Sequence, residues 1–422
     1  MTHSCGIDFG TSNSALAITD TSGGITLAQT EDDEVTLPSA LFYPPSGAPR
    51  FGRAAMQAFT NGEDGRFMRS LKRILGTPLM QQGTQVNGKH KTFHTILKDF
   101  ISHIKDRAES EYQTVLKNVV MGRPVHFVDS DSAANTRAQN ELENIAKAVG
   151  FKNVAFQYEP IAAAFAHERK IESEKLALIA DIGGGTSDFT VIRLSPANKD
   201  KIDRKNDILS NTGVRTGGND LDKNLSLSAF MPILGYKTTY TANNQELPMP
   251  AGPFHDMSEW SKVNFLYTAK TRKTLHDIYR QCTDKRKLNR FIKVLHDETG
   301  HEMLSVVENT KINLTDNESA RASLSFIEDS LAIDVTRTAF NGAIGDNIDT
   351  IFSAMDNCVQ QAGIKNNAIN LVVLTGGTTE VPLIKAAITK SFPHAALSDE
   401  NRLSSVALGL GYNSQRLYQN GA

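Results

Sequence analysis

The chain has 422 residues, 40% of them hydrophobic, and a formal net charge of −2 at pH 7. At roughly 100–200 residues per domain this length predicts two to four domains, and the apolar content excludes general disorder. The balanced charge gives no broad electrostatic attraction to nucleic acid or to an anionic membrane.

The cysteines and the first residues indicate the compartment. Cys5, Cys282 and Cys358 form no CxxC pair and no even framework, which is typical of a reducing compartment. The sequence MTHSCGIDFG lacks the basic region of a signal peptide. No apolar run approaches the ~18 residues that cross a membrane. We therefore expect a soluble, cytoplasmic protein.

The first predicted elements are two strands joined by a turn of small residues. One strand ends at Asp8, the turn covers Gly10 to Ser14, and the second strand runs from Ala15 to Thr19. The stretch from Pro38 to Lys91 is rich in Gly, Pro and Gln, so we expect an inserted subdomain there. Apolar residues at helical spacing then predict a helix between Phe93 and Leu116.

Alternating strands and helices follow. The sequence NVVMGRPVHF predicts a strand that leads into a loop, and a helix begins at Ser132 and stops at Gly150, which suits the position after a helix end. NVAFQYEPIAAAFAHE predicts a short strand, a Glu-Pro break and a helix of small residues. Such alternation is typical of a sheet flanked by helices.

A second strand–turn–strand unit, LALIADIGGGTSDFTVIRL, runs from Leu176 to Leu194. It places Asp181 at the end of a strand, followed by three glycines, two hydroxyl residues and Asp188. The first unit has the same order, with Asp8 followed by Gly10, Thr11 and Ser12. We interpret the pair as an internal duplication that gives two similar lobes, each opening with a β-meander.

The remaining segments repeat this organisation. Leu221 to about Met303 contains a polar loop with three prolines and a charged helical stretch, which we interpret as a second insertion. A helix that ends at Gly363 is followed by a strand, a Gly-Gly turn and a helix in NLVVLTGGTTEVPLIKAAITKSF. Near the C-terminus, GLGYN follows SSVALGL, which predicts close packing of a helix and not a dinucleotide loop.

The two Asp-Gly turns indicate a phosphate site with a metal ion. Glycine lets backbone N–H groups approach an anion, and hydroxyl groups add donors. Carboxylates repel a bare phosphate, but they are ligands for Mg²⁺ between the protein and a polyphosphate. Two carboxylates ~5 Å apart at an effective dielectric of ~20 repel each other by roughly 3 kcal/mol, so a cation would relieve the strain.

Four motifs resemble, in order and spacing, the actin/Hsp70/sugar-kinase ATPase superfamily: GIDFGTSNS, DIGGGTSD, YEPIAAAFA and VVLTGGTTEVPLI. They are most similar to the Hsp70 nucleotide-binding domain, and the closest fit is to short bacterial Hsp70-like proteins that stop after the ATPase domain. The resemblance implies an α/β, two-lobed actin-like ATPase fold with duplicated RNase H-like lobes. Lobe I would cover residues 1–168 with an inserted subdomain at 37–92, and lobe II residues 169–422 with an insertion at 216–344.

The resemblance also implies site residues on the phosphate side. Asp8, Asp181 and Asp188 would hold Mg²⁺, largely through water. Lys72, Glu159 and Thr186 would act on the γ-phosphate and the attacking water, together with Asp8 and Asp181. The phosphates would be bound by residues of four turns: Gly10, Thr11, Ser12, Asn13, Gly183, Gly184, Gly185, Thr186, Gly217, Gly218, Gly376, Gly377 and Thr378.

On the adenosine side, the resemblance implies that Glu308 and Lys311 bind ribose and that Thr315 lies near the base. Two positions depart from the family pattern. Ile312 and Glu380 stand where the family has the arginines that sandwich adenine. Loss of both removes cation–π stacking of about 0.5–2 kcal/mol each, which puts the base preference in question.

The function implied is a slowly hydrolysing Mg-ATPase module that acts as a nucleotide-driven conformational switch and could be chaperone-related. Its ligands would be ATP or ADP and Mg²⁺, and a protein partner could bind an inserted subdomain. No region here matches the peptide-binding domain of Hsp70, so we expect no peptide holding. The alternatives are an actin-like filament ATPase, a catalytically weak nucleotide sensor and a small-molecule kinase.

The basic run DKRKLNR (Asp284 to Arg290) is interpreted as a solvated helix face and not as a nucleic-acid site.

Overall fold

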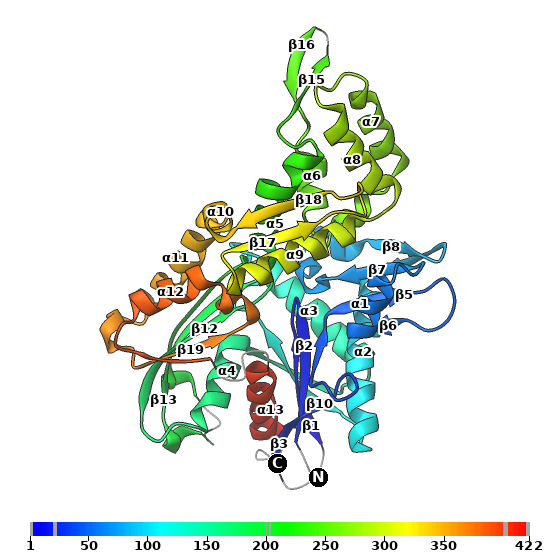
Figure 1. The fold of residues 1–422 in the computed structure, drawn as a ribbon. Coiled ribbons are helices and arrows are strands. Elements are labelled where there is room, and N and C mark those ends of the chain that lie inside the picture. Colours follow the sequence, from blue (N-terminus) through cyan, green and yellow to red (C-terminus); the bar gives the residue numbers. More distant parts are fainter. Residues whose placement is uncertain are drawn as a thin grey trace. The chain divides into compact units, whose positions relative to one another are not determined.

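The computed structural model describes residues 3–19, 23–199, 201, 204–242, 244–399 and 404–418. The chain divides into two compact units (Figure 1). The first consists of Met1–Gly218 and Asp349–Ala422, and the second of Asn219–Ile348. The lobe boundaries 1–168 and 169–422 stay a prediction.

The first unit contains two mixed sheets with the same strand order. Each is an antiparallel meander of three strands, extended on one side by two parallel strands, in the orders β11-β10-β1-β2-β3 and β20-β19-β12-β13-β14. This repeated topology confirms the predicted duplication. In the first sheet the strands are β1 (Ser4–Phe9), β2 (Asn13–Thr19), β3 (Ile25–Leu27), β10 (Asn118–Arg123) and β11 (Asn153–Tyr158), and β4 (Thr36–Pro38) also pairs with β2. In the second they are β12 (Lys175–Ile182), β13 (Ser187–Leu194), β14 (Ile208–Val214), β19 (Leu371–Thr375) and β20 (Ala396–Ser398).

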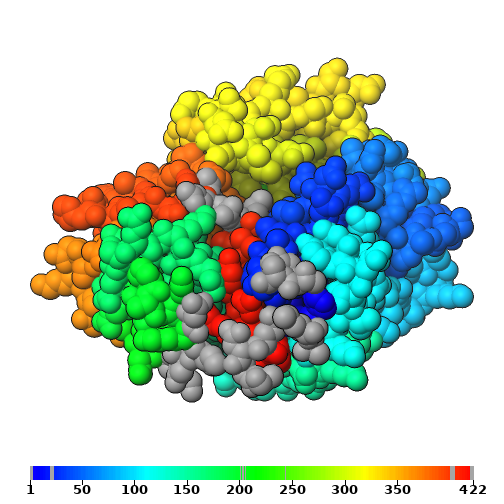
Figure 2. Space-filling view, turned by 90° about the horizontal axis from the view of Figure 1, so that it is seen from below, coloured from blue at the N-terminus to red at the C-terminus, as the bar shows by residue number. Residues whose placement is uncertain are grey.

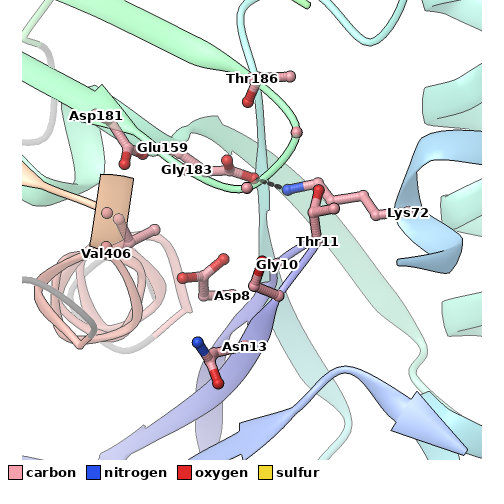
Figure 3. Close-up of a pocket in the computed structure, with 15 residues that line it drawn as sticks. Asp8, Gly10, Thr11, Asn13, Lys72, Glu159, Asp181, Gly183, Thr186 and Val406 are labelled. Carbon is pink, nitrogen blue, oxygen red and sulfur yellow. Dashed lines mark hydrogen bonds and ion pairs between the residues drawn. The ribbon is translucent and has the colours of Figure 1, made fainter. Parts of the chain in front are cut away.

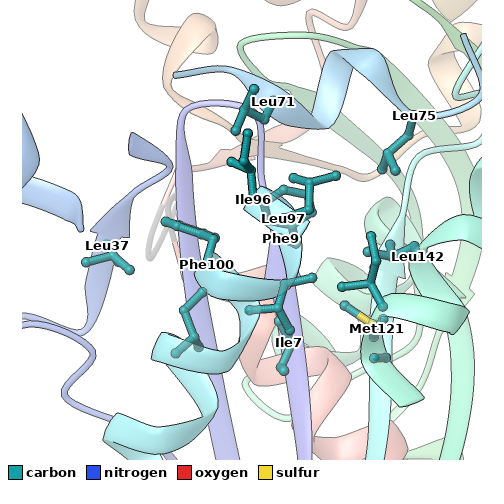
Figure 4. Packing of buried hydrophobic residues seen from close by; sticks show 14 of the residues in the cluster. Ile7, Phe9, Leu37, Leu71, Leu75, Ile96, Leu97, Phe100, Met121 and Leu142 are labelled. Atoms are coloured by element: carbon teal, nitrogen blue, oxygen red, sulfur yellow. The ribbon is translucent and has the colours of Figure 1, made fainter. Parts of the chain in front are cut away.

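Two long helices contribute to the core beside the first sheet, the first predicted from its apolar spacing and the second from its start and stop residues. Helix α2 (Phe93–Tyr112) begins after Thr92, whose side chain accepts the Thr95 N–H, and it buries Ile96, Leu97 and Phe100. Helix α3 (Ser132–Ala148) begins after Asp131, whose carboxylate accepts the Ala134 N–H. Apolar side chains of both helices form one cluster with those of β1 and β10 (Figure 4). This cluster packs against β1 up to Phe9, the last residue of the strand before the turn at Gly10.

The last helix, α13 (Ser405–Tyr418), packs against α4 (Glu159–Glu168) and against β1, β2 and β10. A Cβ atom at Gly409 would lie 1.7 Å from the Ala162 carbonyl oxygen, and one at Gly6 would lie 2.3 Å from the Gly411 nitrogen. The helix can approach this closely only through glycine, which confirms the close packing predicted for GLGYN. Seen from below, α13 appears as a red strip between the blue N-terminal and green middle segments (Figure 2).

The rest of the first unit surrounds these sheets. Between β4 and α2 lie a small sheet in the order β6-β5-β7, a hairpin of β8 and β9, and short 3₁₀ turns, one of which (Leu71–Ile74) carries Lys72. The bounds here are β5 (Ala40–Tyr43), β6 (Arg50–Phe51), α1 (Gly52–Thr60), β7 (Arg66–Arg69), β8 (Gly83–Val86) and β9 (Lys89–Thr92). Two further helices, α11 (Gly345–Gln361) and α12 (Pro382–Ser391), match the helices predicted before Gly363 and after the Gly-Gly turn.

The second unit is mostly helical, with two β-hairpins. Its elements are α5 (Gly218–Leu225), β15 (Thr239–Ala242), β16 (Gln245–Pro248), α6 (Gly252–Met257), α7 (Ala269–Tyr279), α8 (Lys285–His296), α9 (Gly300–Asp316), β17 (Ser319–Ser323), β18 (Ala332–Thr336) and α10 (Arg337–Ala343). Within the described part of the chain, no helix is both long and apolar enough to cross a membrane.

Candidate phosphate and metal site

One pocket of the first unit gathers most of the residues predicted from the two Asp-Gly turns. It is lined by the ends of β1 and β12 and the turns that follow them, by Lys72, by Glu159 at the start of α4, and by the Gly376 turn after β19 (Figure 3). The lining residues are Asp8, Gly10, Thr11, Ser12, Asn13, Lys72, Glu159, Asp181, Gly183, Gly184, Gly185, Thr186, Gly376, Gly377 and Val406.

The first turn is held by two buried hydroxyl residues behind it. The Gly10 N–H donates to Ser14 Oγ at 3.2 Å, and Ser39 Oγ donates to the Gly10 carbonyl oxygen at 2.7 Å. The two hydroxyl groups are themselves 2.9 Å apart. These bonds fix the backbone from Gly10 to Ser14 from behind. The side of the turn that faces the pocket is therefore preorganised.

The second turn closes on itself and touches the first. The Gly183 N–H donates to the Thr186 carbonyl oxygen at 2.9 Å. A Cβ atom at Gly185 would lie 2.5 Å from Thr11 Oγ1, so the two turns approach each other at a distance that only glycine permits. The duplicated Asp-Gly turns thus meet at one place.

Two more glycine turns support the second one. A Cβ atom at Gly217 would lie 2.7 Å from the Gly183 carbonyl oxygen. The Gly218 N–H donates to that oxygen at 2.9 Å, and Thr378 Oγ1 donates to it at the same distance. Gly376 has a φ of +80°, and a Cβ atom there would lie 2.3 Å from the Ile182 carbonyl oxygen. Gly217, Gly218 and Thr378 do not line the pocket. In the structure they support the second turn from outside it.

Two aspartates line the pocket, half-buried Asp8 and buried Asp181, and a third, buried Asp188, pairs with Asp181 on the neighbouring strand but does not line it. Burial and the negative charge of Glu159 hold the pKa of Asp8 well above its usual range, against the opposing effect of Lys72. Burial and Glu159 also raise the pKa of Asp181 to about 6, against a hydrogen bond from Thr375. Burial, Glu159 and Asp181 raise the pKa of Asp188 in the same way. Ionising these carboxylates is therefore costly unless a cation is present.

Asp188 lies opposite Asp181 on the neighbouring strand and is almost fully buried. Its Oδ1 accepts the Val125 N–H at 2.6 Å. Its Oδ2 is buried and has no hydrogen-bond partner among the described residues. A buried carboxylate oxygen without a partner normally binds water or an ion.

One ion pair crosses the pocket. Lys72 Nζ donates to Glu159 Oε1 at 2.5 Å, and both side chains are more than nine-tenths buried (Figure 3). Burial lowers the pKa of Lys72, but Glu159 and Asp8 outweigh that effect and raise it above its usual value. The lysine therefore stays charged. It is the only Lys or Arg that lines the pocket among the described residues.

The structure adds four residues that the motifs did not single out. Thr375 donates to Asp181, Ser14 and Ser39 hold the first turn, and Val406 of α13 lines the pocket. Thr375 was within reach of sequence analysis, because it directly precedes the Gly-Gly turn of a recognised motif. Ser14 was also within reach, because it closes the recognised motif GIDFGTSNS. Ser39 and Val406 carry no local signal, since a buried serine or valine resembles any core residue.

The predicted adenosine-side residues lie on α9 of the second unit. Lys311 Nζ is 2.8 Å from a carboxylate oxygen of Asp222, and Thr315 Oγ1 donates to the Lys311 carbonyl oxygen at 3.4 Å. Ile312, on the same helix, is 53% exposed. The roles of Glu308, Lys311 and Thr315 toward ribose and base stay predictions.

The pocket fits a polyphosphate with a divalent cation. For the phosphates, glycine turns offer backbone donors without a Cβ atom, and Lys72 adds a positive charge. For the cation, there are aspartates that are costly to ionise alone and the unpartnered Oδ2 of Asp188, which suit an ion with its water shell. Among the described residues, no group of three His, Cys, Asp or Glu side chains could hold a metal ion. Contact largely through water, as the resemblance implies, stays a prediction.

Comparison with known families identifies a match over most of the chain. A family model described as "Hsp70 protein" matches residues 4–231 and 272–416. The matched ranges include every residue that lines the pocket.

Proposed function

Since the chain belongs to the Hsp70 family and is an Hsp70-like ATP-binding module, we propose that its pocket binds Mg-ATP, that it hydrolyses ATP slowly, and that nucleotide switches its conformation. The observation that carries the proposal is the meeting of the two duplicated Asp-Gly turns, with Gly185 against Thr11, in a pocket lined by Asp8, Asp181 and, among the described residues, a single lysine. A phosphate chain in this pocket would bridge the two sheets.

Each residue has a proposed part. The turns at Gly10–Asn13 and Gly183–Thr186 orient the phosphate chain through backbone and hydroxyl donors. Asp8, Asp181 and Asp188 would hold Mg²⁺, which when bound neutralises the charge of the carboxylates and the phosphate oxygens. Lys72 faces the place where negative charge develops during phosphoryl transfer.

Hydrolysis is expected to be slow because Glu159 is already engaged. Its carboxylate accepts from Lys72 at 2.5 Å, so it orients the lysine and a water molecule and is not a free general base. Thr186, on the second turn, also lines the pocket and has a hydroxyl group that could hold the water (Figure 3). The consequence is a long-lived nucleotide state, which suits a conformational switch better than a metabolic enzyme.

Thermal unfolding with and without nucleotide tests the proposal. A ligand that binds the folded chain raises the free energy of unfolding by mass action, by about 2.7 kcal/mol at a concentration 100 times its Kd, and so raises the melting temperature. We expect Mg-ATP and Mg-ADP to raise the melting temperature, and Asp181→Asn to abolish that increase. The control is Arg321→Gln on exposed β17 of the second unit, which should leave the increase intact. No increase at millimolar nucleotide with Mg²⁺ would contradict the proposal.

A further inference from the structure

The helices α7 and α8, with the loop between them, are strongly basic. Residues 269–296, called the basic hairpin below, contain nine Lys or Arg and two Asp. The rest of the second unit contains six Lys or Arg and fifteen Asp or Glu. The positive charge of the unit is therefore concentrated in one helical hairpin, whose two helices lie side by side (Figure 1).

Packing turns much of this charge toward solvent. The hairpin buries its apolar side chains Leu275, Ile278, Leu288, Phe291, Val294 and Leu295. Five of its nine cations form ion pairs with nearby acidic residues: Arg272, Arg286, Lys287, Arg290 and Lys293. The other four, Lys270, Lys273, Arg280 and Lys285, are exposed and have no ion pair among the described residues. These four are called the free cations below.

The loop between α7 and α8 is hydrogen-bonded to the hairpin of β15 and β16. The Thr241 N–H donates to the Gln281 carbonyl oxygen at 2.9 Å, and the Thr283 N–H donates to the Thr239 carbonyl oxygen at 3.0 Å. Residues 281–283 thereby pair with β15 through an isolated antiparallel bridge between Tyr240 and Cys282. Arg280 and Lys285 flank this segment, so their backbone is fixed before any partner arrives, which lowers the entropy cost of binding.

We propose that the basic hairpin is the docking surface for a short acidic segment of a partner protein. Charge complementarity carries the assignment, because four exposed cations that have no acidic partner in the described part of the chain lie on one helical hairpin. A long nucleic acid or a membrane would extend beyond the hairpin over a unit whose other residues carry a net charge of −9. Within residues 269–296, no exposed aromatic residue lies between the free cations to stack on bases. A short segment can stay within the hairpin, since about five extended residues span roughly 17 Å, the length of either helix.

Fluorescence anisotropy with a labelled decaglutamate peptide tests the proposal. At 50 mM NaCl we expect saturable binding, with at least a fivefold weaker Kd at 200 mM NaCl because the contacts are exposed and screened. The variant K270E/K273E/R280E/K285E should weaken binding at least tenfold. The control K89E/K152E/K365E/K390E changes four exposed lysines of the first unit by the same total charge and should bind like the unaltered chain.

Two kinds of result would count against the proposal. No binding of decaglutamate at 100 µM, or equal loss in both quadruple variants, would overturn the docking surface. Tighter binding to a 20-nucleotide single-stranded DNA or to phosphatidylserine vesicles would overturn the choice of partner. Both variants should retain the melting temperature increase with Mg-ATP, which shows that they fold and separates this test from that of the nucleotide site.

Discussion

Thr375 Oγ1 donates a hydrogen bond to Asp181 Oδ1 at 2.6 Å, between neighbouring parallel strands of the second sheet. Thr375 is fully buried, and its bond fixes one oxygen of a carboxylate that burial disfavours. Thr375→Val keeps the shape of the side chain and removes the donor. Because hydrogen bonds to charged groups contribute about 1.5–3 kcal/mol, we expect a loss of that order in the free energy of unfolding at pH 7, measured by urea denaturation.

The matched control is Thr190→Val on β13. Thr190 is also fully buried in the second sheet, but its hydroxyl has no hydrogen-bond partner among the described residues. Its replacement should be neutral or slightly stabilising. Equal changes in the free energy of unfolding for the two substitutions would show that the hydrogen bond from Thr375 to Asp181 does not stabilise the fold.

The pH dependence of stability should depend on Asp181. Its pKa is about 6 in the folded, ligand-free chain against an ordinary 3.8, so between these values the folded chain keeps a proton that the unfolded chain has lost. Stability from this group is therefore present at low pH and is lost as the pH rises through about 6, by roughly 3 kcal/mol in all. From pH 5 to 7, the melting temperature of the unaltered chain should therefore fall relative to that of Asp181→Asn, whose side chain does not titrate.

The same titration opposes metal binding, since Mg²⁺ requires the ionised carboxylate. The melting temperature increase caused by Mg-ATP should therefore grow between pH 5.5 and 7.5. A constant increase across this range would argue against an aspartate-held ion.

The Lys72–Glu159 pair allows stability and hydrolysis to be separated. Lys72→Met leaves Glu159 buried without its cation, which typically costs about 3–5 kcal/mol. The double variant Lys72→Met, Glu159→Gln removes both charges, so its free energy of unfolding should lie well above that of the single variant. Neither should release phosphate from ATP, because the proposed charge at the reacting group is gone in both. Phosphate release at the unaltered rate would exclude Lys72 from hydrolysis.

The contact between the two turns predicts the effect of a single methyl group. Gly185→Ala would place a Cβ atom 2.5 Å from Thr11 Oγ1, so the turns must separate. We expect at least a tenfold weaker Kd for Mg-ATP by isothermal titration calorimetry, and partial recovery in Gly185→Ala, Thr11→Ala. At Gly342 an added Cβ meets nothing within 4 Å, so Gly342→Ala should leave the Kd unchanged.

The sequence predicted much of the fold because its signals are local. The strand–Asp–Gly–hydroxyl pattern predicted the two turns, and apolar spacing predicted α2 to within a few residues of its end at Tyr112. The convergence of Asp8 and Asp181 on one pocket followed from their shared pattern. Ser39 and Val406 could not be predicted, because their positions depend on contacts between segments far apart in the chain.

Helix α13 has a consequence for how the chain acquires its pocket during synthesis. The helix comes from residues 405–418, yet it packs on β1 from residues 4–9, and Val406 lines the pocket. A growing chain displays its N-terminal strand long before the ribosome delivers the segment that covers it. The pocket therefore completes only after residues 405–418 have been synthesised, and a truncation ahead of residue 405 would leave that strand face open to other chains.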